Sequence, residues 1–358
     1  MLLYFLWFFF LAGMACTQRH VTLATSMKRF SWGSGEVVTF FLLSAFIGLR
    51  YEVGGDWSTY LEHIELLRAV PFLEFFAYGD PAYALLNWIG SNLFGDVYLV
   101  NTICAFLFCW GLFTFARSQP RSWLVLAVAF PYLILVVAMG YTRQGVAISF
   151  LLLGLVSLMK GALLRFILWV VVAALFHKTV LIFLPLALFS VSKRPVLTAL
   201  GVLLTAGLAF VLLLQEVLDS FVSIYIEAEY GSAGAGFRIA LNVVPAVIYL
   251  LFRHRFALEE RIRRFWTWTS VSAILFIFLL FVSPSTAAVD RLALYWIPLQ
   301  LFVLGRLPEV FGGHGRRNML WVLFLAAYSF SLLFFWLFFA HHSSFWIPYR
   351  FYPAEVIF

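Results

Sequence analysis

Long apolar runs, separated by short polar loops, make up most of this chain. Many of the runs approach the length of about 20 residues at which an α-helix spans the apolar core of a bilayer. The pattern predicts twelve membrane crossings, several of them short, at residues 1–16, 36–49, 97–116, 121–139, 144–160, 161–177, 179–192, 195–215, 237–252, 265–283, 287–305 and 318–340. The fold class that follows is an all-α polytopic integral membrane protein.

One further apolar stretch, PAYALLNWIGSNLFG at 81–95, is short and rich in helix-breaking residues. If it crossed the membrane, every later loop would change sides, and the basic loops would face both ways. It is therefore predicted to be a re-entrant or interfacial helix, which membrane proteins tolerate where protein covers the backbone. The expected architecture is a single transmembrane domain over residues 1–358, with outward loops near 50–96 and 216–236.

Composition excludes a large soluble core. Of the 358 residues, 64% are apolar and only 11% are charged, and the mean hydropathy is +0.97, whereas soluble domains are about 25% charged. The net charge of +7 does not indicate nucleic-acid binding, because most of the excess lies in short loops. The three cysteines, Cys16, Cys104 and Cys109, lack disulfide or zinc-site spacing, and neither a metal site nor a cofactor is predicted.

Basic residues divide unequally between the two ends of the predicted helices. Of the 24 Lys and Arg, 17 fall on one side and 7 on the other, whereas the acidic residues divide 4 to 13. Because Lys and Arg in short loops stay cytoplasmic, both termini are predicted to face outward. The seven outward cations are Arg50, Arg68, Arg143, Lys178, Arg238, Arg291 and Arg350. They oppose this rule, and anionic ligands at the outward face are the simplest explanation.

The first outward cluster, GLRYEVGGDWSTY at 48–60, places an arginine, a carboxylate and a tyrosine hydroxyl in one glycine-rich turn. Arg50, Asp56 and Tyr60 are its candidate functional residues. Two simpler interpretations stay open, because Asp56 can serve only as an N-cap and Arg50 can extend toward the membrane interface.

The second and third clusters lie where apolar helices begin. Arg143 and Gln144 start one helix, and a cation there opposes the helix macrodipole, so capping does not explain it; a structural salt bridge is the alternative. His177 and Lys178 join two apolar runs with almost no loop. Histidine accepts protons near neutral pH, and a neighbouring lysine would keep it neutral, although a histidine satisfied at a helix end is equally compatible.

Two later clusters complete the outward face. STAAVDR at 285–291 contains Asp290 and Arg291, with Tyr295 one turn later, and the acid and the cation could merely neutralise each other or neighbours. The tail WIPYRFYP at 346–353 contains Arg350 within an aromatic stretch typical of a membrane interface. Arginine forks bind phosphate oxygens, so an outward arginine cluster that opens to lipid suits a polyprenyl pyrophosphate.

In this order the motifs resemble those of the EpsG family of bacterial polysaccharide proteins, whose role is similar to that of Wzy O-antigen and exopolysaccharide polymerases. The resemblance spans nearly the whole chain and rests on Gly48-Leu-Arg50, Val53-Gly-Gly-Asp56-Trp57 with Tyr60, Arg143-Gln144, His177-Lys178-Thr179 and Asp290-Arg291. It implies a GT-C-like, inverting, metal-independent glycosyltransferase in the bacterial inner membrane. It also implies a periplasmic active site, undecaprenyl-pyrophosphate-linked oligosaccharide as both donor and acceptor, and a flippase and a chain-length regulator as partner proteins.

This implied chemistry gives each candidate a role. Cations must stabilise the departing pyrophosphate, so Arg143 and Arg291 are expected to bind it, helped by Arg50, Lys178 and Arg350. The further substrate-binding candidates are Tyr60, Gln144, Asp290 and Tyr295. His177 is the first candidate for the general base and Asp56 the second, because a carboxylate would need its pKa raised by burial.

Three other functions stay open at this point. A flippase or other transporter of lipid-linked oligosaccharide would also need cations, but it would line a path with buried charges, and the predicted helices carry almost none. An O-antigen ligase-type transferase, or a glycosyltransferase that uses a polyprenyl monophosphate sugar, would share most of the chemistry.

Overall fold

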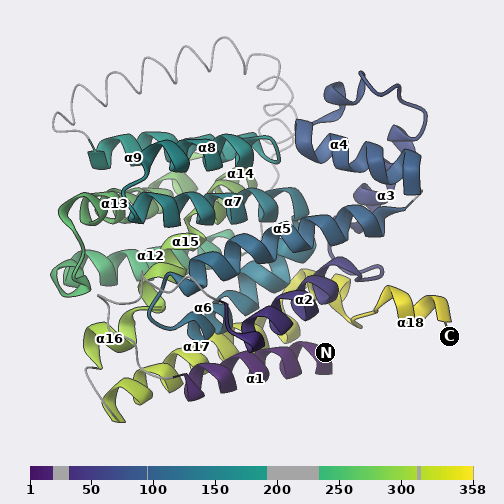
Figure 1. Cartoon of the computed structure of the whole chain (residues 1–358). Helices are drawn as coiled ribbons and strands as arrows, with labels where there is room; N and C mark the ends of the chain where they lie inside the picture. Colours follow the sequence, from purple (N-terminus) through teal and green to yellow (C-terminus); the bar gives the residue numbers. More distant parts are fainter. Residues whose placement is uncertain (19–31, 95, 192–233, 313–315, 358) are drawn as a thin grey trace. The chain divides into compact units, whose positions relative to one another are not determined.

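The computed structural model describes residues 1–18, 32–94, 96–191, 234–312 and 316–357, which are helical along most of their length (Figure 1). Six helices in these ranges are long and apolar enough to span a membrane, namely Val97–Arg117, Thr142–Met159, Ala235–Phe256, Glu260–Val282, Thr286–Phe311 and Arg317–Phe339. The prediction of an all-helical membrane protein is confirmed. Twelve crossings and a GT-C-like architecture stay predictions, and the predicted crossing 195–215 and most of the loop 216–236 lie outside the described residues.

The chain packs as two compact units, one formed by residues 1–181 with 304–358 and the other by residues 182–303. The first unit contains α1 (Leu2–Thr17), α2 (Ser34–Gly48), α3 (Trp57–Leu67), η2 (Phe75–Tyr78), α4 (Pro81–Ile89), η3 (Gly90–Phe94), α5 (Val97–Arg117), α6 (Ser122–Ala129), η4 (Phe130–Ala138), α7 (Thr142–Met159), α8 (Leu163–Ala174), α16 (Leu307–Phe311), α17 (Arg316–Phe339), η9 (His341–Trp346) and α18 (Tyr352–Ile357). The short helix η5 (Lys178–Ile182) ends at the boundary. The prediction of a single transmembrane domain stays a prediction.

The core of the first unit forms around α5 and α7, which pack against each other and against α2 and α8. Helix α7 is almost wholly buried. A small residue permits its close approach to α5, because a Cβ atom on Gly111 would lie 2.2 Å from the carbonyl oxygen of Ser149. The Ser149 hydroxyl also donates to the carbonyl of Leu107 at 2.8 Å. Small residues and a hydroxyl at a helix crossing are typical of membrane helices, where backbones must come close to gain packing.

The second unit contains α9 (Phe183–Val191), α12 (Ala235–Phe252), η7 (Arg253–Phe256), α13 (Glu260–Val282), α14 (Thr286–Ala293), η8 (Leu294–Trp296) and α15 (Ile297–Leu304). Aromatic rings fill its interior, and Trp266 stacks on Phe302 with ring centroids 4.0 Å apart. The buried Asn242 amide donates to the carbonyl of Ala293 at 2.8 Å, which ties α12 to the end of α14.

The stretch predicted to be re-entrant or interfacial forms two short helical pieces, α4 and η3. Helix α4 has nine residues, too few to span a bilayer. With α3 and η2 it encloses a small core of Leu67, Phe75 and Ala84. The indole of Trp88 donates to the carbonyl of Val70 at 2.8 Å, which fixes the turn between α3 and η2. The location of these pieces relative to a bilayer stays a prediction.

Three segments that are distant in sequence meet at the end of α2, and we call them the three-segment junction: residues 49–56, 139–142 and 345–352. The first and third pair through backbone hydrogen bonds, with Gly54 N 2.9 Å from Phe345 O and Tyr51 N 3.0 Å from Arg350 O. Gly54 has a φ of +114°, and a Cβ atom there would lie 2.5 Å from the carbonyl oxygen of Met139. Only glycine meets both constraints.

We expect Gly54→Ala to lower the stability of the protein clearly, because the new methyl group meets backbone and the positive φ adds roughly 1–3 kcal/mol of strain. Thermal unfolding of detergent-solubilised protein would measure the loss. The matched control is Gly79→Ala, since Gly79 has a φ of +131° but a Cβ atom there would meet nothing within 4 Å. Equal losses of stability for the two variants would show that the close contact between residue 54 and Met139 adds nothing to the cost of the positive φ.

Candidate functional site

Arg50 is entirely inside the protein and has neutral partners. Its Nε donates to the carbonyl of Val53 at 3.0 Å and its Nη1 to that of Ile47 at 2.7 Å. Its Nη2 lies 3.1 Å from the hydroxyl of Thr142 and 3.5 Å from Oδ1 of Asn101. The side chain is 0% exposed. These contacts connect α2, the following turn, α5 and the first residue of α7, so direct ligand binding by Arg50 stays a prediction.

Tyr60 holds the same end of α7 from a different helix. Its hydroxyl accepts a hydrogen bond from the backbone N–H of Thr142 at 2.9 Å and donates to the carbonyl of Gly140 at 3.0 Å. The hydroxyl therefore satisfies one of the free N–H groups at the start of α7, where the N-cap residue Tyr141 makes no side-chain capping bond. Arg50 and Tyr60 both bind Thr142, the residue immediately before Arg143, and together they fix the position of Arg143.

Arg143 differs from Arg50 in both exposure and bonding. Its side chain is 39% exposed, and its Nη1 lies 3.8 Å from Oδ2 of Asp80, beyond hydrogen-bond distance. Its guanidinium carbon lies 5.6 Å from the ring centroid of Tyr83, a cation–π contact. Within the described residues Arg143 donates no hydrogen bond, so its five N–H groups are available to a ligand.

Asp80 lies between two cations. Its Oδ1 accepts from the backbone N–H of Lys178 at 3.4 Å, and the positive charges of Arg143 and Lys178 both act on it. A backbone bond of 2.9 Å from Ala82 N to Leu175 O docks the start of α4 against the end of α8. Burial raises the pKa of Asp80, and the charge of Arg143 and the N–H of Lys178 partly oppose this rise.

His63 is the third unpredicted residue in this region, with Asp80 and Tyr83. It lies half-buried on α3, one turn after Tyr60. Burial lowers its pKa, the charge of Arg143 lowers it further, and Glu62 raises it. We call the group formed by Arg143, Lys178, Asp80, Tyr83 and His63 the Arg143 site. Its unpredicted members lie in the acidic loop predicted to face outward and carry no motif of their own, so only packing reveals them.

The other predicted residues of the first unit lie on several of its segments. Asp56 is the N-cap residue of α3, yet its side chain makes no capping hydrogen bond. Gln144 is buried in α7, and His177 lies in the turn before η5. Arg350 pairs with Glu52 at 2.7 Å, with both side chains about half-exposed. Roles for these residues in binding or catalysis stay predictions.

Among the predicted residues of the second unit, Asp290 is paired with a residue of that unit. Asp290 accepts two hydrogen bonds from Arg238, at 2.8 Å from Nε and 2.7 Å from Nη2. This bidentate pair corresponds to the alternative in which a neighbour neutralises Asp290. Tyr295 is fully buried and Arg291 is half-buried. Substrate binding by these three predicted residues stays a prediction.

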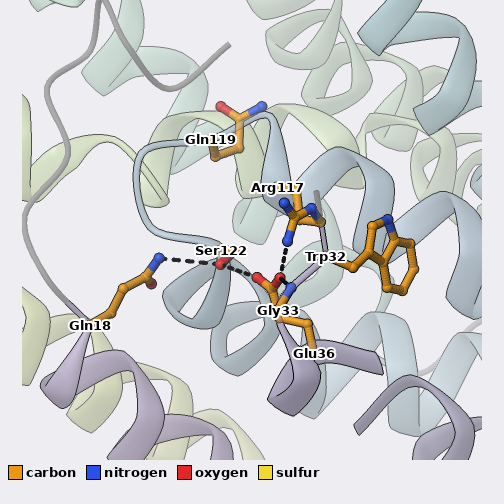
Figure 2. Close-up of a pocket in the computed structure, with 7 residues that line it drawn as sticks. All are labelled: Gln18, Trp32, Gly33, Glu36, Arg117, Gln119 and Ser122. Atoms are coloured by element: carbon orange, nitrogen blue, oxygen red, sulfur yellow. Dashed lines mark hydrogen bonds and ion pairs between the residues drawn. The ribbon is translucent and has the colours of Figure 1, made fainter. Parts of the chain in front are cut away.

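A polar cavity of about 310 Å³ lies at the other end of α5. Figure 2 shows Gln18, Ser122, Glu36 and Arg117 joined in a chain of hydrogen bonds and one ion pair, with Ser122 2.9 Å from Glu36. The Arg143 site lies toward the opposite end of α5, where Asn101 contacts Arg50. The cavity's acid and cation are already paired with each other, so we place the candidate site at Arg143.

We expect Arg50→Lys to lower the free energy of unfolding by roughly 3 kcal/mol, because one ammonium cannot replace three separate nitrogen donors in a buried site. Arg143→Lys should change it by no more than about 0.5 kcal/mol, as is usual for an exposed side chain. Thermal or chemical unfolding in detergent would compare the two. Similar losses for both variants would show that Arg143 is also a structural residue.

Asp80→Asn should stabilise the protein at neutral pH. A carboxyl whose pKa is raised in the folded state holds its proton more tightly there than in the unfolded chain. The folded protein therefore loses stability as the pH rises from the unfolded pKa through the raised folded pKa. The amide removes this penalty. Melting temperatures measured from pH 4 to 8 should show an advantage for Asp80→Asn that disappears toward the usual Asp pKa of about 3.9. A control substitution at the exposed Glu74, Glu74→Gln, should show no such advantage.

Comparison with known proteins places these residues in a family. A model of the EpsG family matches residues 37–351, which include most of the chain and the whole Arg143 site. Neither a curated protein nor a solved structure matches the chain. The three-segment junction also falls within the matched range, except for Tyr352. Because the match covers far more than half of the chain, this membrane protein belongs to the EpsG family.

Proposed function

We propose that this protein is a glycosyltransferase that lengthens a polysaccharide by joining lipid-linked oligosaccharide repeat units at the periplasmic face of the bacterial inner membrane. Membership of the EpsG family supports a membrane protein of the polysaccharide polymerase type. The observation that carries the proposal is the state of Arg143, which is 39% exposed and donates no hydrogen bond to a described residue. Lys178 supplies a second exposed cation across Asp80.

A polyprenyl pyrophosphate is the substrate class that this site suits best. The planar guanidinium of Arg143 can donate two parallel hydrogen bonds to phosphate oxygens, and the ammonium of Lys178 adds a mobile point charge. Two cations against the single carboxylate of Asp80 leave net positive charge for an anion. The apolar helices of the first unit would let the prenyl chain stay in the bilayer while the diphosphate reaches the site. Undecaprenyl-pyrophosphate-linked oligosaccharide is thus the proposed donor and acceptor.

The proposed reaction is one displacement at the anomeric carbon of the donor. The acceptor hydroxyl oxygen forms the new glycosidic bond as the carbon–oxygen bond to pyrophosphate breaks, and that electron pair leaves with the phosphate oxygen. A base removes the hydroxyl proton, and the configuration at carbon inverts. Arg143 and Lys178 stabilise the charge that grows on the departing pyrophosphate, which is where fixed cations lower the barrier most. Arg50 and Tyr60 contribute by positioning Arg143 through Thr142.

The paired charges at the far end of α5 favour an enzyme over a flippase. Arg117 pairs with Glu36, and Arg121 lies 2.9 Å from Glu309. A transporter of pyrophosphate would need cations there that accept the substrate in turn. An O-antigen ligase-type transferase would use the same displacement on a different acceptor, so the products must distinguish it from a polymerase.

The decisive experiment supplies purified protein in lipid nanodiscs with its lipid-linked repeat unit, without nucleotide sugar. We expect a ladder of longer lipid-linked glycans. Removing one group that stabilises transition-state charge typically lowers a rate by roughly 100- to 1000-fold, and we expect a loss of this size for Arg143→Ala. The matched control is Arg68→Ala, because Arg68 is an exposed cation of the same unit that pairs with Glu65.

Folded protein that yields no ladder from a verified cognate substrate would overturn the polymerase. Transfer of the glycan to a different lipid acceptor would instead identify a ligase-type transferase. A ladder that Arg143→Ala leaves unchanged would overturn the placement of the site at Arg143.

A further inference from the structure

Three aromatic rings from α3, α5 and α18 come together beside the three-segment junction (Figure 1). Tyr98, near the start of α5, stacks on Tyr352, the first residue of α18, with ring centroids 3.6 Å apart and an interplanar angle of 18°. The indole of Trp57, the first residue of α3, lies 5.9 Å from the Tyr98 ring. We call these three rings, with Glu52 and Arg350, the tyrosine platform.

The backbone pairing of the junction directs part of this platform away from the core. Arg50 and Phe351 form an antiparallel bridge, and successive side chains in such a pairing point to opposite faces. Arg50 points inward and is 0% exposed, so Arg350 and Tyr352, on either side of Phe351, point to the other face. Arg350 is exposed and Tyr352 is partly exposed. The burial of Arg50 therefore turns these two side chains toward the surface of the unit.

Glu52 and Arg350 add hydrogen-bonding groups to the rings. Their ion pair of 2.7 Å leaves Glu52 51% and Arg350 43% exposed. Within the described residues this pair uses one nitrogen of the guanidinium and one oxygen of the carboxylate. The other nitrogens and the second oxygen can bond the hydroxyl groups of a ligand. Because the two charges cancel, the pair offers an anion no excess of positive charge, in contrast to the Arg143 site.

This combination of groups suits a glycan better than a lipid chain. A sugar ring packs its C–H face on an aromatic ring, while its hydroxyl groups exchange hydrogen bonds with carboxylates and guanidinium groups beside that ring. A prenyl chain would instead take water away from Glu52 and Arg350 without offering hydrogen bonds in return. Aromatic residues that only anchor a protein at a membrane interface need no ion pair next to them.

Trp57 connects the platform to the Arg143 site. Its ring has Tyr98 as one neighbour, and the guanidinium carbon of Arg50 lies 5.8 Å from the centroid of the same ring. Arg50 in turn lies 3.1 Å from the hydroxyl of Thr142, the residue immediately before Arg143. The platform and the proposed pyrophosphate-binding cations therefore lie at the same end of the first unit, where one substrate of several sugars can reach both.

We propose that the tyrosine platform binds sugar units of the lipid-linked glycan, a role that rests on the proposed function. Tyr98 and Tyr352 supply the ring surface, and Glu52 and Arg350 bond the sugar hydroxyls. The sugars can belong to the growing donor chain or to the incoming acceptor repeat unit. In both cases the platform contacts sugars away from the reacting carbon, so it contributes to substrate affinity and therefore to KM, and little to kcat.

The first measurement follows ladder formation over a range of substrate concentrations for Tyr98→Ala, Tyr352→Ala and Tyr352→Phe. An aromatic contact contributes roughly one power of ten to affinity, so each alanine variant should raise KM about 10-fold with kcat nearly unchanged. Tyr352→Phe keeps the ring and should keep most of the affinity. A higher KM from the first transfer onward would identify the acceptor as the bound glycan, whereas a ladder that stops at shorter chains would identify the donor chain.

Trp321→Ala provides the matched control, because it breaks another stacked pair of the first unit. Trp321 stacks on Phe311 with ring centroids 5.4 Å apart. It follows Asn318 by three residues on α17, and Asn318 accepts from Arg121 near the far end of α5. This variant should keep the KM and the ladder of the wild type.

A second measurement is independent of turnover. Its probe is the oligosaccharide that mild acid releases from the lipid-linked repeat unit, which carries neither lipid nor pyrophosphate. Calorimetry in detergent should show that this oligosaccharide binds about 10-fold more weakly to Tyr98→Ala and Tyr352→Ala but equally well to Arg143→Ala. Inorganic pyrophosphate should show the reverse pattern.

A wild type that fails to bind the released oligosaccharide, or that binds it no better than both alanine variants, would overturn the role of the platform, while its ladder would still support the proposed function. A loss confined to kcat, with glycan binding unchanged, would also overturn that role. A wild type without any ladder would overturn the proposed function, and weaker oligosaccharide binding by the alanine variants would then still identify the platform as a glycan site.

Discussion

The buried guanidinium of Arg50 is the constraint on which the rest of this end of the molecule depends. A charge taken out of water is costly unless hydrogen bonds surround it, and Arg50 obtains them from neutral groups on α2, the following turn, α5 and α7. These acceptors can serve it only if the four elements keep their relative positions. Arg50 therefore fixes the start of α7, and this fixed start holds Arg143 with its side chain partly exposed.

Cations of the first unit fall into two groups, those in close ion pairs with carboxylates and those held only by longer contacts. At the far end of α5, arginines are bound to carboxylates, as in the pair between Arg121 and Glu309. At the near end, Arg350 pairs closely with Glu52 at 2.7 Å, but Arg143 and Lys178 share Asp80 through contacts of 3.8 and 3.4 Å, the second of them to a backbone N–H. Close ion pairs stabilise a fold locally, whereas long contacts leave the cation able to exchange its partner for a ligand. This difference between close and long contacts separates structural charge from charge that can serve chemistry.

Apolar periodicity in the sequence was enough to predict an all-helical membrane protein, because the bilayer permits little else for such long apolar runs. Arg50, Tyr60 and Arg143 also belong to motifs that the charge pattern predicts to face outward, and the structure joins them through Thr142. The sequence could not predict that Arg50 is buried and hydrogen-bonded through all three of its nitrogens whereas Arg143 is partly exposed. Burial and the number of hydrogen bonds that an arginine donates depend on contacts between distant segments. His63, Asp80 and Tyr83 escaped notice for the same reason. His63 and Tyr83 lie on short amphipathic helices and Asp80 immediately precedes one. A histidine or a carboxylate is ordinary there until packing brings it to Arg143.

The pairing of residues 49–54 with residues 345–352 sets a limit on when this end of the protein can form. Glu52 and Arg350, which face each other across it, are 298 residues apart, and contacts of such long range must wait for the later segment. At a synthesis rate of about 5–20 residues per second, roughly 15 to 60 s pass between the two. During that interval the turn that contains Arg50 lacks its backbone hydrogen bonds to residues 345–352. Assembly of this region is therefore a late event in biogenesis. Chains interrupted before it would contain the six long apolar helices of the described residues but would lack the three-segment junction.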